Sequence, residues 1–237
     1  MNTILFDLDG TLLPMDQDSF IQIYFKNLAT HFIPFGYQPE AMMAAVNIGV
    51  KAMILNDGSM TNEERFWSVF EKQLGEGVRT LEPEFRIFYN TDFLKAKAAT
   101  TMNPYTSKII KLLKEKGYTL VIATNPLFPT IATHNRIQWA GFDKNEVDYI
   151  TTYEVSSYCK PNPNYYKEIL EKLQKKPEEC MMVGNDVTED MLVDQLGLSR
   201  YLVTDCLVNL KQEDISSIPQ GSLKDFYEFA QTLPQVK

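Results

Sequence analysis

Cysteine and histidine are scarce in this chain. Its 237 residues include three cysteines and two histidines, and the thiols of Cys159, Cys180 and Cys206 form no CxxC or CxxH pair. This spacing excludes a disulfide-stapled secreted scaffold and gives no support for a zinc site built on closely spaced Cys and His ligands. We therefore expect a reduced, cytoplasmic setting in which Cys180 is a small core residue. Cys159, beside Lys160, could be a thiol of lowered pKa, but the favoured interpretation is a residue without a role in the chemistry.

Long apolar runs and excess positive charge are also missing. No apolar stretch approaches the roughly 20 residues needed to span a bilayer, and no basic segment precedes the first strand, so we expect no signal peptide. The formal net charge is −8, which disfavours binding to nucleic acid or to an anionic membrane. We expect binding to neither nucleic acid nor a membrane. The oligomeric state cannot be predicted from the sequence.

The chain does contain enough apolar residues for a large core, and one dense acidic motif. Hydrophobic residues make up 44% of it. The apolar segment Ile4–Phe6 runs directly into Asp7-Leu8-Asp9-Gly10-Thr11. Two carboxylates placed this closely repel each other unless a cation or a reacting group compensates their charge. The motif therefore offers a nucleophile, a proton-transfer group and part of a metal site.

Strand and helix patterns alternate in the first residues and again from about residue 103. Residues 118–123 form a nearly continuous apolar, β-branched run, which is typical of a strand buried on both faces. Strands separated by single helices predict an α/β fold with a doubly wound, parallel, Rossmann-like sheet. The predicted strands are 3–7, 118–123, 147–152, 180–183 and 201–203, and the predicted helices are 104–116, 129–140, 163–173, 187–196 and 223–233.

Residues 15–100 have a different pattern, which predicts helices and no convincing strand. Helical periodicity or capping signals cover 20–32, 40–55, 61–74 and 83–90. The predicted organisation is a catalytic core of residues 1–14 and 101–237 with a helical domain of residues 15–100 inserted after the first strand. Its aromatic and methionine side chains are interpreted mainly as packing surfaces, although some could line a pocket.

Polar residues follow the predicted strands, where a doubly wound sheet forms its binding crevice. Each could have a local structural role as a helix cap or a surface charge, but together they favour a site for a hard cation. Oxygen ligands favour Mg²⁺ over zinc. Besides Asp7 and Asp9, these residues are Thr124, Asn125, Lys160, Asn185, Asp186 and Asp190.

Four motifs in this order resemble the haloacid dehalogenase-like hydrolase superfamily. They are Asp7-Leu8-Asp9-Gly10-Thr11, Thr124-Asn125, Lys160-Pro161, and Gly184-Asn185-Asp186 with Asp190. The resemblance covers the whole chain, and the long insertion after the first motif is similar to the subfamily with a helical cap at that point.

The resemblance implies a Mg²⁺-dependent phosphatase that hydrolyses a small phosphorylated metabolite through an aspartyl-phosphate. Asp7 would be the nucleophile and Asp9 the general acid and base, and the presence of Asp9 favours phosphoryl transfer over dehalogenation. The implied phosphate-binding groups are Thr124, Lys160 and the backbone N–H groups near Leu8 and Asn125. The implied metal ligands are Asp7, the Asp9 carbonyl and Asp186, supported by Asn185 and Asp190.

Several alternatives stay open at this stage. A phosphosugar mutase would share every core residue, and a non-catalytic regulatory member would retain the fold without turnover. Either Asn185 or Asp186 could ligate the metal, because Asn185 stands where many relatives have aspartate. The substrate itself is not predicted.

Overall fold

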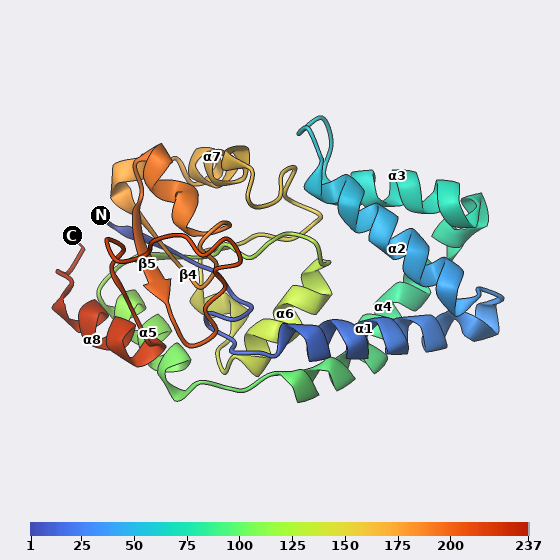
Figure 1. Ribbon diagram of the computed structural model, residues 1–237, viewed down its shortest axis with the longest axis horizontal. Coiled ribbons are helices and arrows are strands. Elements are labelled where there is room, and N and C mark those ends of the chain that lie inside the picture. Colours follow the sequence, from blue (N-terminus) through green and yellow to red (C-terminus); the bar gives the residue numbers. More distant parts are fainter. Residues whose placement is uncertain (237) are drawn as a thin grey trace.

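A six-stranded parallel sheet forms the centre of one region of the computed structural model, which describes residues 1–236 (Figure 1). The strand order is β3-β2-β1-β4-β5-β6, and every neighbouring pair is parallel. The fold is therefore the predicted α/β, Rossmann-like arrangement. The strands are β1 (Thr3–Phe6), β2 (Thr119–Ile122), β3 (Tyr149–Ile150), β4 (Cys180–Gly184), β5 (Ser199–Val203) and β6 (Gln220–Gly221).

Helices cover both faces of the sheet, and the apolar strand β1 is therefore buried on both sides. Ile4 and Phe6 pack in a core cluster with residues of α5, α6 and α8, and the rings of Phe6 and Phe226 meet edge to face at 5.7 Å. Leu5 points to the other face and packs with α7. These helices are α5 (Pro104–Glu115), α6 (Thr130–Trp139), α7 (Pro163–Leu173) and α8 (Leu223–Thr232), with short 3₁₀ helices at Lys144–Glu146, Pro177–Glu179 and Met191–Leu196.

The sheet register aligns the carboxyl ends of three central strands. Phe6, the last residue of β1, pairs with Ile122 of β2 on one side and with Val183 of β4 on the other. The chain proceeds outward from β1 through β2 and β3, then crosses to β4, β5 and β6, so a topological switch point lies beside β1. Ligands bind at such points in open α/β sheets.

The second region consists of helices between Gln17 and Ala99, and we call it the helical region. Its α3 helix begins with the predicted capping box, in which Thr61 and Glu64 exchange side-chain and backbone hydrogen bonds. Aromatic side chains fill its interior, as in the tilted pair Phe32 and Phe85, with ring centroids 4.3 Å apart. The helices are α1 (Gln17–Phe32), α2 (Pro39–Ile54), α3 (Asn62–Leu74) and α4 (Glu82–Asn90), with 3₁₀ helices at Ile33–Phe35, Glu76–Leu81 and Asp92–Ala99.

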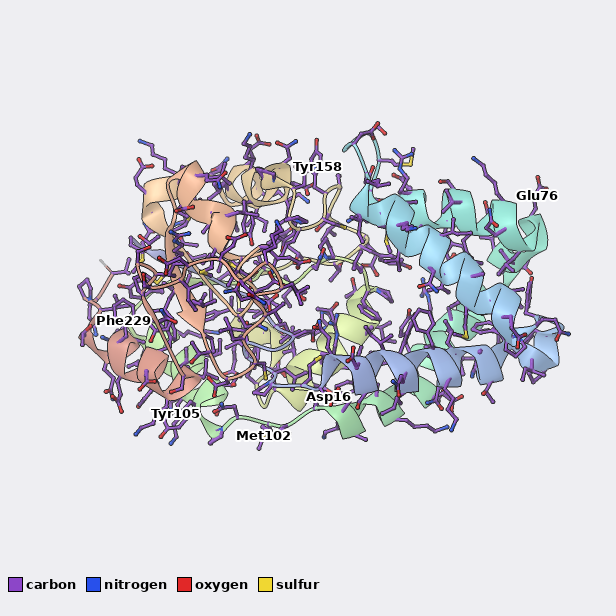
Figure 2. The ribbon with its side chains drawn as sticks, viewed as in Figure 1. Asp16, Glu76, Met102, Tyr105, Tyr158 and Phe229 are labelled. Atoms are coloured by element: carbon purple, nitrogen blue, oxygen red, sulfur yellow. The ribbon has the colours of Figure 1, made fainter. Side chains whose placement is uncertain are left out.

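Two linkers connect the regions side by side. Met15 and Thr100 form an antiparallel bridge, and the Asp16 amide donates to the Ala99 carbonyl at 3.0 Å. Figure 2 places Asp16 and Met102 near this junction, whereas Glu76 lies at the far end of the helical region.

The helical region also touches the α/β region through the α2–α3 loop and the first residues of α3. The Asn62 amide donates to the Ser156 carbonyl at 2.8 Å, and the Glu63 amide donates to the Tyr153 carbonyl at 2.8 Å. A Cβ on Gly58 would stand 2.1 Å from the Tyr158 hydroxyl, so this loop packs directly on the loop after β3 (Figure 2). The helical region therefore contacts the α/β region on two sides.

Some predicted elements are shorter or different in the structure. The predicted helix 187–196 is wrong at its start, because residues 187–190 form turns and only Met191–Leu196 is a 3₁₀ helix. The Asp186 carboxylate accepts from the amides of Thr188 and Glu189, as a helix N-cap does. The Asp190 carboxylate accepts from the Asp186 amide and from Lys160, and the turn after Asp186 does not continue as an α-helix. The predicted strand 147–152 is reduced to Tyr149–Ile150, and the short β6 at Gln220–Gly221 was not predicted.

None of the helices among residues 1–236 combines the length and the apolar character that crossing a bilayer requires.

Candidate active site

Asp7 follows β1 directly and is held on three sides. Its amide donates to the Val183 carbonyl of β4 at 2.9 Å. Its Oδ1 accepts from Lys160 Nζ at 2.8 Å, and its Oδ2 accepts from Thr11 Oγ1 at 3.1 Å. The residue is 7% exposed. Asp7 is therefore a buried carboxylate whose orientation is fixed by a cation and a hydroxyl.

Gly10 allows the loop after Asp7 to turn back on itself. Its φ is +87°, a region that favours glycine, and a Cβ there would stand 2.5 Å from Asn185 Nδ2. Thr11 Oγ1, one residue later, also contacts Asn185 Oδ1 at 2.9 Å. Asn185 Nδ2 in turn donates to the Cys206 carbonyl at 2.7 Å. The Asn185 side chain thus ties the acidic loop to the segment after β5.

Asp9 has a partner that the sequence did not reveal. Its Oδ2 forms an ion pair with Nη1 of Arg136 on α6, and the Arg136 side chain is 1% exposed. The Arg136 guanidinium also lies 4.6 Å from the centroid of the Phe128 ring and donates to Thr133 Oγ1 at 3.1 Å. Burial raises the pKa of the Asp9 carboxyl above its usual range, although Arg136 opposes the shift.

Lys160 is buried between two carboxylates. Its Nζ lies 2.8 Å from Asp7 Oδ1 and 2.6 Å from Asp190 Oδ1, and the Lys160 and Asp190 side chains are each 1% exposed. Burial favours the neutral amine, but Asp190 and Asp7 outweigh it and hold the pKa of Lys160 well above its ordinary value. Burial raises the pKa of Asp190, and Lys160 opposes that rise. The ammonium is therefore retained next to Asp7.

Thr124 and Asn125 follow β2 as predicted. The Thr124 carbonyl accepts from Thr151 Oγ1 at 2.7 Å and from the Tyr165 hydroxyl at 2.9 Å, which fixes the backbone at this strand end. Asn125 Nδ2 donates to the carboxylate of Glu189 at 3.2 Å, and its buried Oδ1 has no hydrogen-bond partner among the described residues.

Asp186 and Asn185 have different surroundings, which bears on the open question of the metal ligand. The Asn185 side chain is engaged by Thr11 and by the Cys206 carbonyl. Asp186 uses Oδ1 to accept from two amides of the following turn, and no residue in 1–236 donates a hydrogen bond to its Oδ2. Asp190 Oδ2 accepts from the Asp186 amide at 3.0 Å. Asp186 therefore has the freer oxygen of the two candidate ligands.

Most of the predicted site residues line one cavity of about 510 Å³, and Leu8 and Lys160 do not. It lies between the sheet's carboxyl edge and the helical region, and Lys160 stands behind its Asp7 wall. Sequence reasoning missed Arg136, whose contact with Asp9 spans 127 residues and leaves no local pattern, and it missed Glu189. The predicted residues that line the cavity are Asp7, Asp9, Thr124, Asn125, Asn185, Asp186 and Asp190.

The fit of these residues to Mg²⁺ can be tested on their donor atoms. Among residues 1–236, no three His, Cys, Asp or Glu side chains form a complete metal cluster. Mg²⁺ does not require one, because it commonly binds through one or two carboxylates, with waters and substrate oxygens completing its shell. Asp7 and Asp186 supply two carboxylates at the cavity, and no backbone or side-chain group in the described chain donates to the Asp9 carbonyl. The donor set fits a hard cation.

Cys159, beside Lys160, is buried and is not an activated thiol. Burial raises the pKa of Cys159 to about 12, and its Sγ accepts from Asn62 Nδ2 at 3.3 Å. This environment opposes the alternative of a thiol with lowered pKa and agrees with the favoured interpretation, in which Cys159 has no role in the chemistry.

Comparisons with known proteins identify phosphatases that are similar to this chain. The chain is 28% identical over 218 residues to glyceraldehyde 3-phosphate phosphatase of Methanothermobacter thermautotrophicus, with 91% of each chain covered. It is 28% identical to pyrophosphatase PpaX of Anoxybacillus flavithermus, over 78% of this chain and 75% of that protein.

Solved structures share the fold at low sequence identity. A HAD phosphatase from Thermococcus onnurineus superposes with a TM-score of 0.58 at 16% identity and full coverage of both chains. The L-2-haloacid dehalogenase of Xanthobacter autotrophicus also gives 0.58 at 16% identity, covering 98% of this chain and 99% of that one.

A family model described as haloacid dehalogenase-like hydrolase matches residues 1–193. That match includes all four motifs, from Asp7 to Asp190, and so confirms the resemblance inferred from them. The chain belongs to the haloacid dehalogenase-like hydrolases.

Proposed function

We propose that this hydrolase is a Mg²⁺-dependent phosphatase that acts on a small phosphorylated metabolite through an aspartyl-phosphate intermediate. One observation carries the proposal: Asp7 and Asp9 face the same cavity, and Lys160 Nζ lies 2.8 Å from Asp7 Oδ1. A buried carboxylate held by a fixed ammonium is suited to accept a phosphoryl group, because the cation offsets the repulsion between two anions. The names of the two phosphatase relatives support the same reaction class.

Asp7 attacks phosphorus with one carboxylate oxygen in this mechanism. Lys160 holds the carboxylate in place and attracts the phosphoryl group. Thr124 and the backbone N–H groups of Leu8 and Asn125 contribute donors to the phosphoryl oxygens. Asp7, the Asp9 carbonyl and Asp186 would hold Mg²⁺, with Asp190 and Asn185 in support, and the bound cation would neutralise charge on those oxygens.

Asp9 moves the proton. It protonates the leaving oxygen as the substrate P–O bond breaks, and it then removes a proton from the water that hydrolyses the aspartyl-phosphate. Its pKa is raised by burial, which favours the protonated form needed for the first step. Arg136 keeps the Asp9 side chain turned to one position during both steps.

We further propose that residues 15–100 act as a cap domain over a core formed by residues 1–14 and 101–237. The paired linkers at Met15 and Thr100 and the contacts of the α2–α3 loop support this division. A cap excludes water from the reacting phosphoryl group and selects the rest of the substrate. The cytoplasmic location inferred from the sequence stays a prediction.

The test is hydrolysis of p-nitrophenyl phosphate with Mg²⁺, with EDTA, and by the Asp7→Asn variant. We expect turnover with Mg²⁺ only and none from Asp7→Asn. Metal-independent turnover, or an active Asp7→Asn enzyme, would refute the mechanism. The open alternatives give other results in the same experiment: a phosphosugar mutase converts a hexose 1-phosphate without releasing phosphate, and a regulatory member turns over neither compound.

A further inference from the structure

The cavity extends from the acidic residues into the helical region, where its lining becomes aromatic. Side chains of α1, α3 and α4 meet the loops after β2 and β3 there. We call this part the aromatic chamber and define it by Phe20, Tyr24, Phe66, Trp67, Phe85, Tyr89, Phe128 and Tyr153.

Within residues 1–236, no residue that lines the cavity is basic. Its charged lining residues are all acidic, and all follow β1 or β4 at the phosphoryl end. Lys160 is engaged by Asp7 and Asp190, and Arg136 by Asp9. A second phosphate or a carboxylate on the substrate would therefore enter the chamber without a counter-ion. Burying an unpaired anion is strongly unfavourable.

The few polar groups in the chamber suit a neutral partner. The hydroxyls of Tyr24 and Tyr89 lie 3.2 Å apart and bond to each other. The Trp67 indole N–H is buried and has no hydrogen-bond partner of normal geometry in the described part of the chain, although the Tyr153 hydroxyl is its neighbour. A neutral oxygen on a bound molecule could accept from it. Aromatic walls with one or two polar groups are typical of sites for apolar or planar ligands.

We propose that the aromatic chamber binds the leaving group of the substrate, and that this group is uncharged and largely apolar or aromatic. The proposal rests on the phosphatase function above. The substrate class is a phosphate monoester with one anionic end, whose P–O bond breaks so that phosphate and a neutral alcohol are released. At about 510 Å³ the cavity falls in the roughly 300–1,000 Å³ range of pockets that bind drug-sized ligands. A three-carbon phosphate or pyrophosphate would leave the aromatic walls uncovered.

A binding experiment tests the chamber independently of turnover. The chain has two tryptophans, Trp67 in the chamber and Trp139 on α6. With Mg²⁺ present, the protein is titrated with 4-phenylbutylphosphonate and with the same compound carrying a para-carboxylate, while fluorescence is recorded. We expect the phosphonate without the para-carboxylate to bind at least about 10-fold more tightly and to change the fluorescence of the wild type but not of Trp67→Phe. Equal or tighter binding of the carboxylate would overturn the proposal.

A matched pair of variants checks the location. Val50 on α2 lines the cavity, whereas Ile54, one helical turn further, is 40% exposed and does not. Val50→Lys places a cation beside the chamber. We therefore expect the ratio of the affinities for the two phosphonates to shift toward the carboxylated compound by about 10-fold or more. Ile54→Lys should keep the wild-type ratio. The same shift in both variants, or in neither, would contradict the assigned chamber.

Kinetic measurements with phosphate esters that differ in their leaving groups distinguish failure of the chamber proposal from failure of the phosphatase function on which it rests. The substrates are 3-phenylpropyl phosphate, its para-carboxylate and glyceraldehyde 3-phosphate, with acetyl phosphate as a small reference. We expect kcat/KM to be highest for 3-phenylpropyl phosphate among the three esters. Turnover of acetyl phosphate without that preference would overturn the chamber proposal alone. If no substrate is turned over while the phosphonate without the carboxylate still binds more tightly, the phosphatase function is refuted and the chamber proposal is retained.

Discussion

The ion pair between Arg136 and Asp9 yields the sharpest test of how the site is held together. We consider Arg136→Met, which keeps much of the apolar stem but removes the guanidinium. Arg136 is 1% exposed and Asp9 is 20% exposed, so removal of either partner leaves a charge in a largely buried place. Breaking such a pair typically costs about 3–5 kcal/mol. In a domain of 150–250 residues each kcal/mol lowers Tm by about 2–4 °C, so we expect a fall of about 10 °C.

A double-mutant cycle isolates the pair from the other contacts of Arg136. The four proteins are the wild type, Arg136→Met, Asp9→Asn and the double variant, compared by urea unfolding in EDTA. Each single change strands one partner, whereas the double change strands neither, so its cost should fall below the sum of the two by about 2–3 kcal/mol. Additive costs would show that Arg136 matters only through its packing on Phe128 and its bond to Thr133.

Three further predictions concern other parts of the structure. Lys160→Met should lower kcat by at least about 100-fold in the p-nitrophenyl phosphate assay, because Asp7 loses its fixed cation; near-normal kcat would contradict that role. At pH 8, iodoacetamide should modify Cys206 in the folded protein before Cys159 and Cys180, because burial raises the pKa of the latter two thiols to about 12 and about 11; mass spectrometry showing early modification of Cys159 would refute this. Gly10→Ala should destabilise the protein by about 1–3 kcal/mol in urea unfolding, since alanine there is strained at φ +87° and would meet Asn185; an unchanged midpoint would contradict the turn geometry.

The strands and their polar ends could be predicted from the sequence because their signals are local. Residues 3–6 and 180–184 are short apolar runs that form buried strands, and parallel pairing brings the residues after them together. Residues 187–190 form turns where a helix was predicted, and their Asp190 side chain bonds to Lys160, 30 positions away, a contact that the apolar period does not reveal.

The aromatic walls of the cavity and the pairing of Arg136 with Asp9 depend on tertiary contacts, which no local sequence pattern encodes. Arg136 lies on a helix whose periodicity says nothing about a partner 127 positions away. Phe20 and Tyr24 were interpreted mainly as packing residues, and they do pack, with Tyr24 8% exposed. The same side chains also line the cavity, because one face of a packed aromatic ring can border a hollow. Packing and binding are therefore not exclusive alternatives for such residues.

The double attachment of the helical region has a kinetic consequence. The paired linkers can serve as a pivot only if the α2–α3 loop detaches, and detachment breaks the hydrogen bonds from the Asn62 and Glu63 amides to the loop after β3. At about 1 kcal/mol for each bond, these two bonds alone would limit the detached form to roughly 3%, and the contact of Asn62 Nδ2 with Cys159 Sγ would lower that population further. Substrate entry and product exit would then depend on a rarely populated open form, and hydrogen exchange at the Asn62 and Glu63 amides measures how often it forms. The turnover rate would in this case depend partly on a contact that does not itself touch the reacting phosphoryl group.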